Sequence, residues 1–115
     1  MKEKSESQIL SAICTYLDST WIRGKYSVTD MSGNHYRRHG RLGRPGWPDI
    51  SGCIPGKGKF FAIEVKGIYG RVSDAQKEVL GGLARAGGLV ILARCVEDVA
   101  KRLDPLLAEY SAGRN

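Results

Sequence analysis

The sequence lacks any apolar run that approaches the roughly 20 residues needed to cross a bilayer, and residues 2–8 lack the apolar centre of a secretion signal. Cysteine is scarce. Cys14, Cys53 and Cys95 form an odd set without a close pair, which argues against a disulfide framework and against a zinc knuckle. We therefore expect a cytoplasmic protein that makes no membrane contact and keeps its thiols reduced.

Acidic residues are in the minority, with 12 Asp and Glu against 18 Lys and Arg, so the formal net charge is +6. This excess favours polyanionic partners, of which nucleic acid is the most common, although many basic domains bind no nucleic acid. The 115-residue length, the 42% hydrophobic content and the absence of repeats or linkers predict a single domain, residues 1–115, around one core.

Hydrophobic periodicity predicts an alternation of helices and strands. The expected helices are residues 3–18, 73–86 and 96–112, and the expected strands are residues 21–28, 49–53, 59–66 and 89–93. Pro105 interrupts the last helical pattern, and Asp104 before it suits an N-cap, so two short helices are expected there. The order of elements predicts an α/β fold in which helices flank a small mixed β-sheet.

The strand predicted at residues 59–66 carries two charged side chains on one face. Because side chains alternate along a strand, Glu64 and Lys66 point to the same side of the sheet. A simple ion pair at the strand end would explain them, since burying either charge alone is costly. The alternative adds Asp49, which begins the partner strand and would bring a second carboxylate beside Glu64.

Two neighbouring carboxylates suit a hard divalent cation such as Mg²⁺, which takes oxygen ligands from carboxylates, waters and substrate phosphate. Such a cation acidifies a bound water and neutralises phosphate charge. The Lys66 ammonium would orient that water or stabilise the charge that develops on the phosphate. Asp49 with Glu64-Val65-Lys66 is therefore typical of phosphodiester hydrolysis, although carboxylate-x-lysine triplets are common on strands.

Four segments, in this order and spacing, together resemble the virus-type replication-repair nuclease (VRR-NUC) domain of the PD-(D/E)XK nuclease superfamily. They are residues 46–50 with Pro48-Asp49, residues 61–67 with Glu64-Val65-Lys66, Ser73-Asp74-Ala75-Gln76, and Gly87-Gly88 before an apolar strand. The resemblance covers nearly the whole chain. It implies a restriction-endonuclease-like fold and a Mg²⁺- or Mn²⁺-dependent endonuclease in which Asp49 and Glu64 hold the metal and Lys66 is catalytic.

Two further residues match the family and also have a simpler explanation. Glu6 falls within the apolar stripe of the first helix and is expected to point inward, whereas a solvated carboxylate in a first turn would stabilise the helix dipole. Ser73 and Gln76 form the Ser-x-x-Gln pattern of a capping box, which explains both residues without catalysis. The resemblance implies active-site roles for Glu6 and Gln76.

Residues 34–44 form the most basic stretch of the chain and contain no acidic residue. Because this segment leads directly into Asp49, its arginines are expected to contact DNA phosphates, for which the guanidinium group is well suited. A solvated charged loop is the alternative. The residues predicted to contact DNA are Arg37, Arg38, Arg41, Arg44, Arg71 and Ser73.

The resemblance further implies a homodimer that hydrolyses branched DNA, such as four-way (Holliday) junctions, because small members of the family resemble junction-processing enzymes of phages and prophages. A two-fold dimer would present two active sites to the two related strands of a junction. Trp21, Trp47 and Leu42 lie outside clear core periods and are candidates for the pairing surface. The alternatives are a nuclease for flaps or single-stranded DNA, and a non-catalytic nucleic-acid-binding module on a nuclease scaffold.

Overall fold

The described part of the chain, residues 3–29 and 45–114 of a computed structural model, is built around a mixed β-sheet with the strand order β1-β2-β3-β4. The strands are β1 (Tyr26–Val28), β2 (Ile50–Ile54), β3 (Lys59–Val65) and β4 (Leu89–Ala93). Strands β1, β2 and β3 pair antiparallel, whereas β3 and β4 pair parallel. The parallel pair requires a crossover, which α2 (Asp74–Arg85) supplies.

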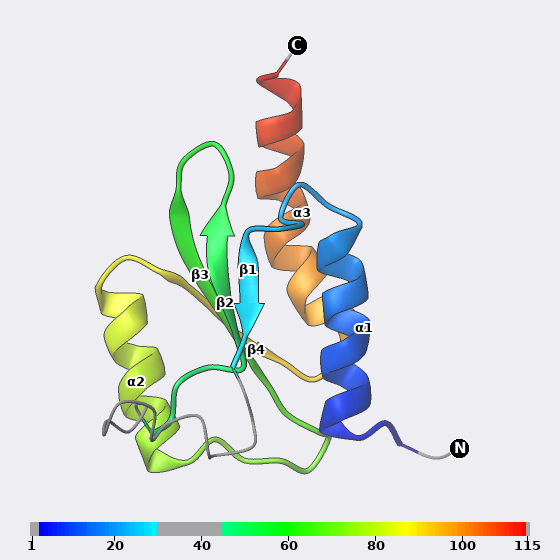
Figure 1. Ribbon diagram of the computed structural model, residues 1–115. Helices are drawn as coiled ribbons and strands as arrows, with labels where there is room; N and C mark the ends of the chain where they lie inside the picture. The colour runs from blue at the N-terminus through cyan, green and yellow to red at the C-terminus, as the bar shows by residue number, and fades with distance from the viewer. Residues whose placement is uncertain (1–2, 30–44, 115) are drawn as a thin grey trace, which may run out of the picture.

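Helices α1 (Glu6–Asp18) and α3 (Val96–Ala112) lie against one face of the sheet, and α2 lies on the other (Figure 1). Helices α1 and α3 contact each other as well as β3 and β4, respectively, and α2 contacts β4. The predicted α/β fold, a small mixed sheet flanked by helices, is confirmed. None of the helices within the described ranges is long and apolar enough to cross a membrane.

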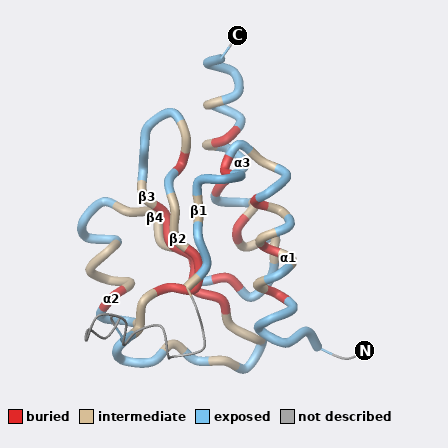
Figure 2. The backbone as a smooth tube through the Cα atoms, in the orientation of Figure 1, coloured by how far each residue is buried: buried red, intermediate tan, exposed pale blue. Residues whose placement is uncertain are grey.

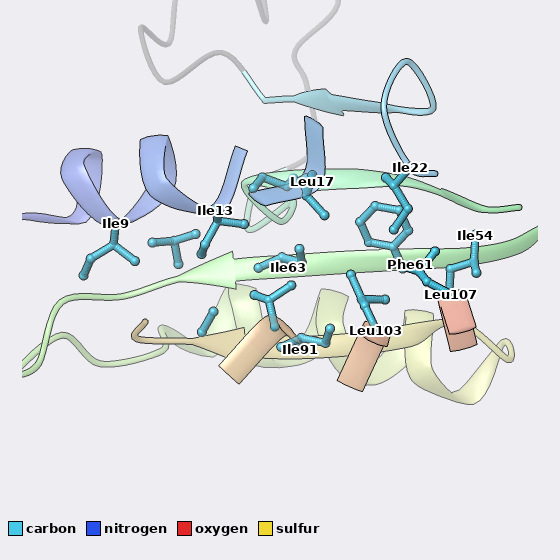
Figure 3. Packing of buried hydrophobic residues seen from close by; sticks show 14 residues of the cluster. Ile9, Ile13, Leu17, Ile22, Ile54, Phe61, Ile63, Ile91, Leu103 and Leu107 are labelled. Atoms are coloured by element: carbon cyan, nitrogen blue, oxygen red, sulfur yellow. The ribbon is translucent and has the colours of Figure 1, made fainter. Parts of the chain in front are cut away.

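The hydrophobic core fills the space between the sheet and the pair α1 and α3. Alternation along β3 directs Phe61 and Ile63 into this space, where they pack with Ile13 of α1 and Leu103 of α3 (Figure 3). Full burial of such a side chain contributes about 1.5–3 kcal/mol. Figure 2 shows that burial is concentrated in the sheet and on the helix sides that face it. Strand β3 is therefore a rigid support for the side chains on its other face.

Helix α1 begins at Glu6 rather than at residue 3, because Ser5 is its N-cap. The Ser5 hydroxyl accepts a hydrogen bond from the Gln8 backbone N–H at 3.2 Å, and the Gln8 side chain accepts one from the Ser5 N–H at 2.8 Å. This capping box fixes the first turn. The predicted earlier start is wrong because apolar spacing alone does not locate a cap.

Helix α3 is continuous through Pro105, so the predicted division into two short helices is wrong. A proline in a helix interior removes one backbone hydrogen bond and costs about 3 kcal/mol. Leu103 and Leu107, on either side of it, are buried in the core and offset that cost. Asp104 is not an N-cap. Its carboxylate accepts a hydrogen bond from the Tyr16 hydroxyl of α1.

Strand β1 is shorter than the strand predicted at residues 21–28. Residues 21–24 form a turn in which Gly24 has a φ of +78°, a left-handed conformation that favours glycine. The turn also buries Ile22 in the core. Only the last three residues of the predicted strand, Tyr26–Val28, pair with β2.

Candidate active site

The antiparallel register of β2 and β3 brings Asp49 next to Glu64. Ile50, the first residue of β2, pairs with Ile63, so the residue before Ile50 lies opposite the residue after Ile63. The Asp49 oxygen Oδ2 accepts a hydrogen bond from the Val65 backbone N–H at 2.8 Å. The two carboxylates predicted to hold a metal therefore lie side by side at the end of β3.

The backbone that leads into Asp49 is fixed from two sides. Gly46 has a φ of +85°, and a Cβ atom there would lie 2.6 Å from the Ala75 carbonyl, so glycine allows this backbone to touch the first turn of α2. On the other side, Thr29 donates its N–H to the Asp49 carbonyl oxygen at 2.8 Å and its hydroxyl to the Pro48 carbonyl oxygen at 2.6 Å. Asp49 is thus held between α2 and the end of β1.

Glu64 is the more deeply buried of the two carboxylates, with 1% of the residue exposed against 8% for Asp49. Its oxygen Oε2 accepts a hydrogen bond from Gln76 Nε2 at 2.9 Å and lies 3.4 Å from Lys66 Nζ. Its other oxygen, Oε1, is buried and has no hydrogen-bond partner among the described residues. A buried carboxylate oxygen without a donor is costly, so this position favours a cation.

Both carboxylates have pKa values above their ordinary range. Burial, followed by the charge of Asp49, raises the pKa of Glu64 to about 7, against the opposing effect of the Lys66 ammonium. Burial also raises the pKa of Asp49, while the hydrogen bond from the Val65 N–H lowers it. Two ionised carboxylates this close repel each other, and a divalent cation between them removes the repulsion.

Gln76 uses the two ends of its side-chain amide for different partners. Its Oε1 accepts a hydrogen bond from the Ser73 N–H at 2.9 Å, and the Ser73 hydroxyl accepts one from the Gln76 N–H at 3.1 Å, which forms the predicted capping box of α2. Because Oε1 faces Ser73, Nε2 is directed toward Glu64. The helix cap therefore orients the amide that restrains the buried carboxylate.

The side chains of Lys66 and Glu6 both lie next to the loop that follows β3, residues 67–72. The Lys66 side chain is only 11% exposed. Glu6 is exposed, unlike the inward position predicted for it, but its Oε1 accepts a hydrogen bond from the Gly67 N–H at 3.3 Å. A Cβ atom on Gly70 would lie 3.2 Å from Glu6 Oε1 and 3.3 Å from Lys66 Cδ. The loop thus brings Glu6 to the edge of the site.

Sequence reasoning missed Arg94, which directly follows β4. Its guanidinium donates hydrogen bonds to the carbonyl oxygens of Gly67 and Ile68, and so holds the loop of residues 67–72. The parallel register pairs Val65 with Ala93, so the residues that follow β3 and β4 emerge at the same edge of the sheet. The predicted order of strand, helix and strand already implied that the strands at residues 59–66 and 89–93 could pair in parallel. That pairing would have placed Arg94 beside the loop.

The site fits a divalent cation through its carboxylates. Within residues 3–29 and 45–114, no three His, Cys, Asp or Glu side chains are grouped closely enough to hold a metal ion by themselves. Mg²⁺ needs fewer protein ligands, because it keeps several waters and is usually held by one or two carboxylates together with substrate phosphate. Glu64 Oε1, buried without a partner beside Asp49, is an oxygen donor of that kind.

The residues predicted to contact DNA fall into two groups. Arg71 is exposed in the loop before α2, and the hydroxyl of Ser73 is engaged as the N-cap of that helix. Four others lie outside the described residues: Arg37, Arg38, Arg41 and Arg44. A contact of these six residues with DNA remains a prediction.

The two tryptophans considered for a pairing surface between copies of the chain differ in exposure. Trp21 is 44% exposed and packs edge-on against Tyr110 of α3, with the ring centroids 5.6 Å apart. Trp47 is half-buried, and its ring centroid lies 6.5 Å from that of Phe60. Leu42 lies outside the described residues. Of the two tryptophans, Trp21 offers more accessible surface.

Comparison with known proteins gives two matches to the same domain. The VRR-NUC domain profile matches residues 27–97. A solved structure described as "VRR_NUC domain protein" superposes with a TM-score of 0.71 over 90% of this chain and 88% of its own, at 18% sequence identity, which establishes a shared fold. No curated protein matches the chain.

The matched segment covers more than half of the chain, from β1 to the first turn of α3. It contains Asp49, Glu64, Lys66 and Gln76, whose side chains meet at the end of β3. The chain therefore belongs to the VRR-NUC domain family, a family of nucleases that generally depend on a divalent metal.

Proposed function

We propose that this chain is a metal-dependent endonuclease that hydrolyses phosphodiester bonds in DNA. The observation that carries the proposal is the buried, unpartnered Glu64 Oε1 beside Asp49, in a member of a nuclease family. Asp49 and Glu64 would hold Mg²⁺ or Mn²⁺ through their carboxylate oxygens. A bound cation of this kind supplies a more acidic water and neutralises charge on the phosphate.

Lys66 is the residue that stabilises the negative charge developing on the phosphate. Its ammonium lies 3.4 Å from Glu64 Oε2, and its side chain is 11% exposed, so the low-dielectric surroundings strengthen its electrostatic effect. Gln76 donates to the same Glu64 oxygen at 2.9 Å and limits rotation of the carboxylate. The charged groups are therefore oriented before substrate binds, which is the condition for efficient electrostatic catalysis.

The DNA backbone would be bound by the chain segments that lead into the site. Arg37, Arg38, Arg41 and Arg44 precede Asp49 in the sequence, and Arg71 with Ser73 precedes the body of α2. Guanidinium groups bind phosphate through paired hydrogen bonds and carry no information about base sequence. Recognition therefore depends on backbone and shape.

Branched DNA, such as a four-way junction, is the proposed substrate, and a homodimer is the proposed assembly. A junction offers two strands related by a two-fold axis, and a two-fold dimer places one active site on each. The formal net charge of +6 per chain favours association with a polyanion such as DNA.

Cleavage of labelled linear, flap and four-way DNA in Mg²⁺, Mn²⁺ or EDTA tests this function. We expect cleavage with either cation, none in EDTA, and preference for the branched substrates. Cleavage that persists in EDTA would contradict metal dependence. Binding without cleavage under every condition would favour the non-catalytic binding module, and cutting restricted to flaps or single strands would replace the junction as substrate.

A further inference from the structure

An exposed aromatic side chain lies close after the active-site lysine in the sequence. Tyr69 is 81% exposed and Ile68 is 58% exposed, the two highest values among the exposed large apolar side chains of the described residues. Both lie in the loop of residues 67–72, which begins directly after Lys66. Single exposed apolar residues are ordinary, but a tyrosine this exposed buries little surface and so contributes little to the stability of the fold.

The backbone beneath Tyr69 is held in place. The Gly67 N–H donates to Glu6, Arg94 donates to the Gly67 and Ile68 carbonyl oxygens, and the Gly70 N–H donates to the Gly67 carbonyl oxygen at 3.0 Å. In Figure 1 this loop runs along the bottom of the molecule, from the start of α1 to the start of α2. The ring therefore projects from an ordered turn, which lowers the entropy cost of a contact with a ligand.

The loop is continuous with the catalytic groups. A Cβ atom on Gly70 would lie 3.3 Å from Lys66 Cδ, and the Cα of Tyr69 is one residue away, about 3.8 Å from that of Gly70. Arg71, also exposed, adds a cation on the same loop. Tyr69 lines a hollow together with Glu6 and Gly70, and Gly70 borders both Glu6 and Lys66. A nucleotide whose phosphate lies at Lys66 would extend along this turn toward Tyr69.

We propose that Tyr69 stacks on a nucleobase next to the cleaved phosphate, and that the substrate carries an unpaired or unstacked nucleotide at that position. This inference rests on the proposed nuclease function and narrows its substrate. In continuous duplex DNA, each base face is covered by its neighbours, so a protein ring stacks only where a base has left the helix. Branch points, flaps and strand ends provide such bases. Stacking tolerates any base, because every base has a π-face.

The test uses four-way and flap DNA with the fluorescent base 2-aminopurine at the branch point, bound in EDTA to full-length protein. Wild type and Tyr69→Phe, which keeps the ring, are expected to change the 2-aminopurine fluorescence, whereas Tyr69→Leu, which keeps apolar bulk but no ring, is not. In Mg²⁺, Tyr69→Leu should lower kcat/KM by about 5- to 150-fold, the range that a stacked base contributes. A reporter within a paired arm is the control and should not respond.

Failure of this inference is distinguishable from failure of the proposed function. If wild type cleaves and Tyr69→Leu matches it in both cleavage and fluorescence, the stacking role is overturned while the nuclease stands. If wild type cleaves nothing, a Tyr69-dependent fluorescence change still supports stacking. If Tyr69→Leu instead converts a dimer to a monomer and leaves the fluorescence of bound DNA unchanged, the ring belongs to a protein interface and the proposal fails.

Discussion

Two ion pairs at opposite ends of β3 have the same separation and different surroundings. The Lys66–Glu64 pair and the Lys57–Glu109 pair each have a nitrogen–oxygen distance of 3.4 Å. The side chains of the second pair are 71% and 62% exposed, against 11% and 2% in the first. Exposed pairs contribute only about 0–1 kcal/mol, whereas removing two charges from water is costly. Burial, rather than distance, separates a surface ion pair from a candidate catalytic one.

The polar groups at the two ends are also satisfied to different degrees. Near the β2–β3 hairpin, Arg114 donates to the Tyr110 hydroxyl at 2.9 Å and its guanidinium lies 4.7 Å from the centre of the Trp21 ring. At the other end, Glu64 Oε1 stays buried without a partner among the described residues. An unpaired buried oxygen is unfavourable for folding, and a bound cation or water would satisfy it.

The largest expected effect comes from changing the buried carboxylates. Glu64→Gln or Asp49→Ala should reduce cleavage of a four-way junction below detection, because each removes a negatively charged metal ligand. Glu109→Gln, the matched change in the exposed pair, should leave cleavage unchanged. Melting of the metal-free proteins at pH 8 checks folding, and Glu64→Gln should melt no lower than wild type there, because burial raises the pKa of Glu64 and so disfavours its charged form. Full activity in Glu64→Gln would remove the proposed site.

The second expected effect is a difference in cleavage rate between variants of Lys66 and Lys57, the lysines of the buried and the exposed ion pair. Lys66→Met should lower the cleavage rate by about 100- to 1,000-fold, because the ammonium acts most strongly on charge that develops in the transition state. DNA affinity, measured in EDTA, should change far less. Lys57→Met is the control and should alter neither quantity. Equal losses of rate and affinity in Lys66→Met would reassign Lys66 to ground-state phosphate binding.

A third effect separates two glycines with left-handed backbones. Gly46→Ala places a Cβ atom 2.6 Å from the Ala75 carbonyl, whereas a Cβ atom on Gly58, which has a φ of +66°, would have no atom within 4 Å. Gly58→Ala should therefore cost only backbone strain, about 1–2 kcal/mol in urea unfolding. Gly46→Ala should cost more and also slow cleavage by displacing Asp49. Equal unfolding free energies and normal cleavage would contradict the role given to Gly46.

The smallest expected effect concerns the salt dependence of DNA binding. Changing Arg37, Arg38 and Arg41 to alanine should weaken binding, and each arginine that binds a phosphate should account for a decrease of roughly 0.9 in the slope of log affinity against log salt. Arg102→Ala, on the exposed side of α3, is the control. An unchanged slope would make the basic segment a solvated loop.

Local sequence patterns predicted helices and strands correctly where tertiary packing did not override the local preference. The apolar run of β4 after Gly87-Gly88 matches the predicted strand, and α2 starts at the predicted capping box. The continuity of α3 could not be predicted in the same way. Whether Pro105 divides a helix depends on the burial of Leu103 and Leu107 against other elements, which is a property of the packed molecule.

The same distinction applies to the candidate site. Strand alternation is local, so it predicted that Glu64 and Lys66 share a face. Other contacts join distant parts of the chain, so local patterns do not predict them. Gly46 touches the first turn of α2, and Arg94 donates a hydrogen bond to the Gly67 carbonyl oxygen. No local pattern encodes which carboxylate oxygen is left without a donor.

The raised pKa of Glu64 gives metal binding a defined pH dependence. Burial moves this pKa from its ordinary value of 4.5 to about 7 in the folded protein. The folded state therefore binds more protons than the unfolded chain between these values, and this group makes the metal-free fold less stable as the pH rises through that window. Metal must displace a proton from Glu64 at pH 6 but not at pH 8, so affinity should be higher at pH 8.

Calorimetric titration of Mn²⁺ into wild type, Glu64→Gln and Glu109→Gln at pH 8 and pH 6 tests the central claim most directly. The account predicts that wild type and Glu109→Gln bind Mn²⁺ at pH 8 and bind it roughly tenfold more weakly at pH 6, while Glu64→Gln binds at neither pH. Binding by Glu64→Gln with the affinity and pH dependence of wild type would contradict the assignment of the Asp49 and Glu64 carboxylates as the metal site.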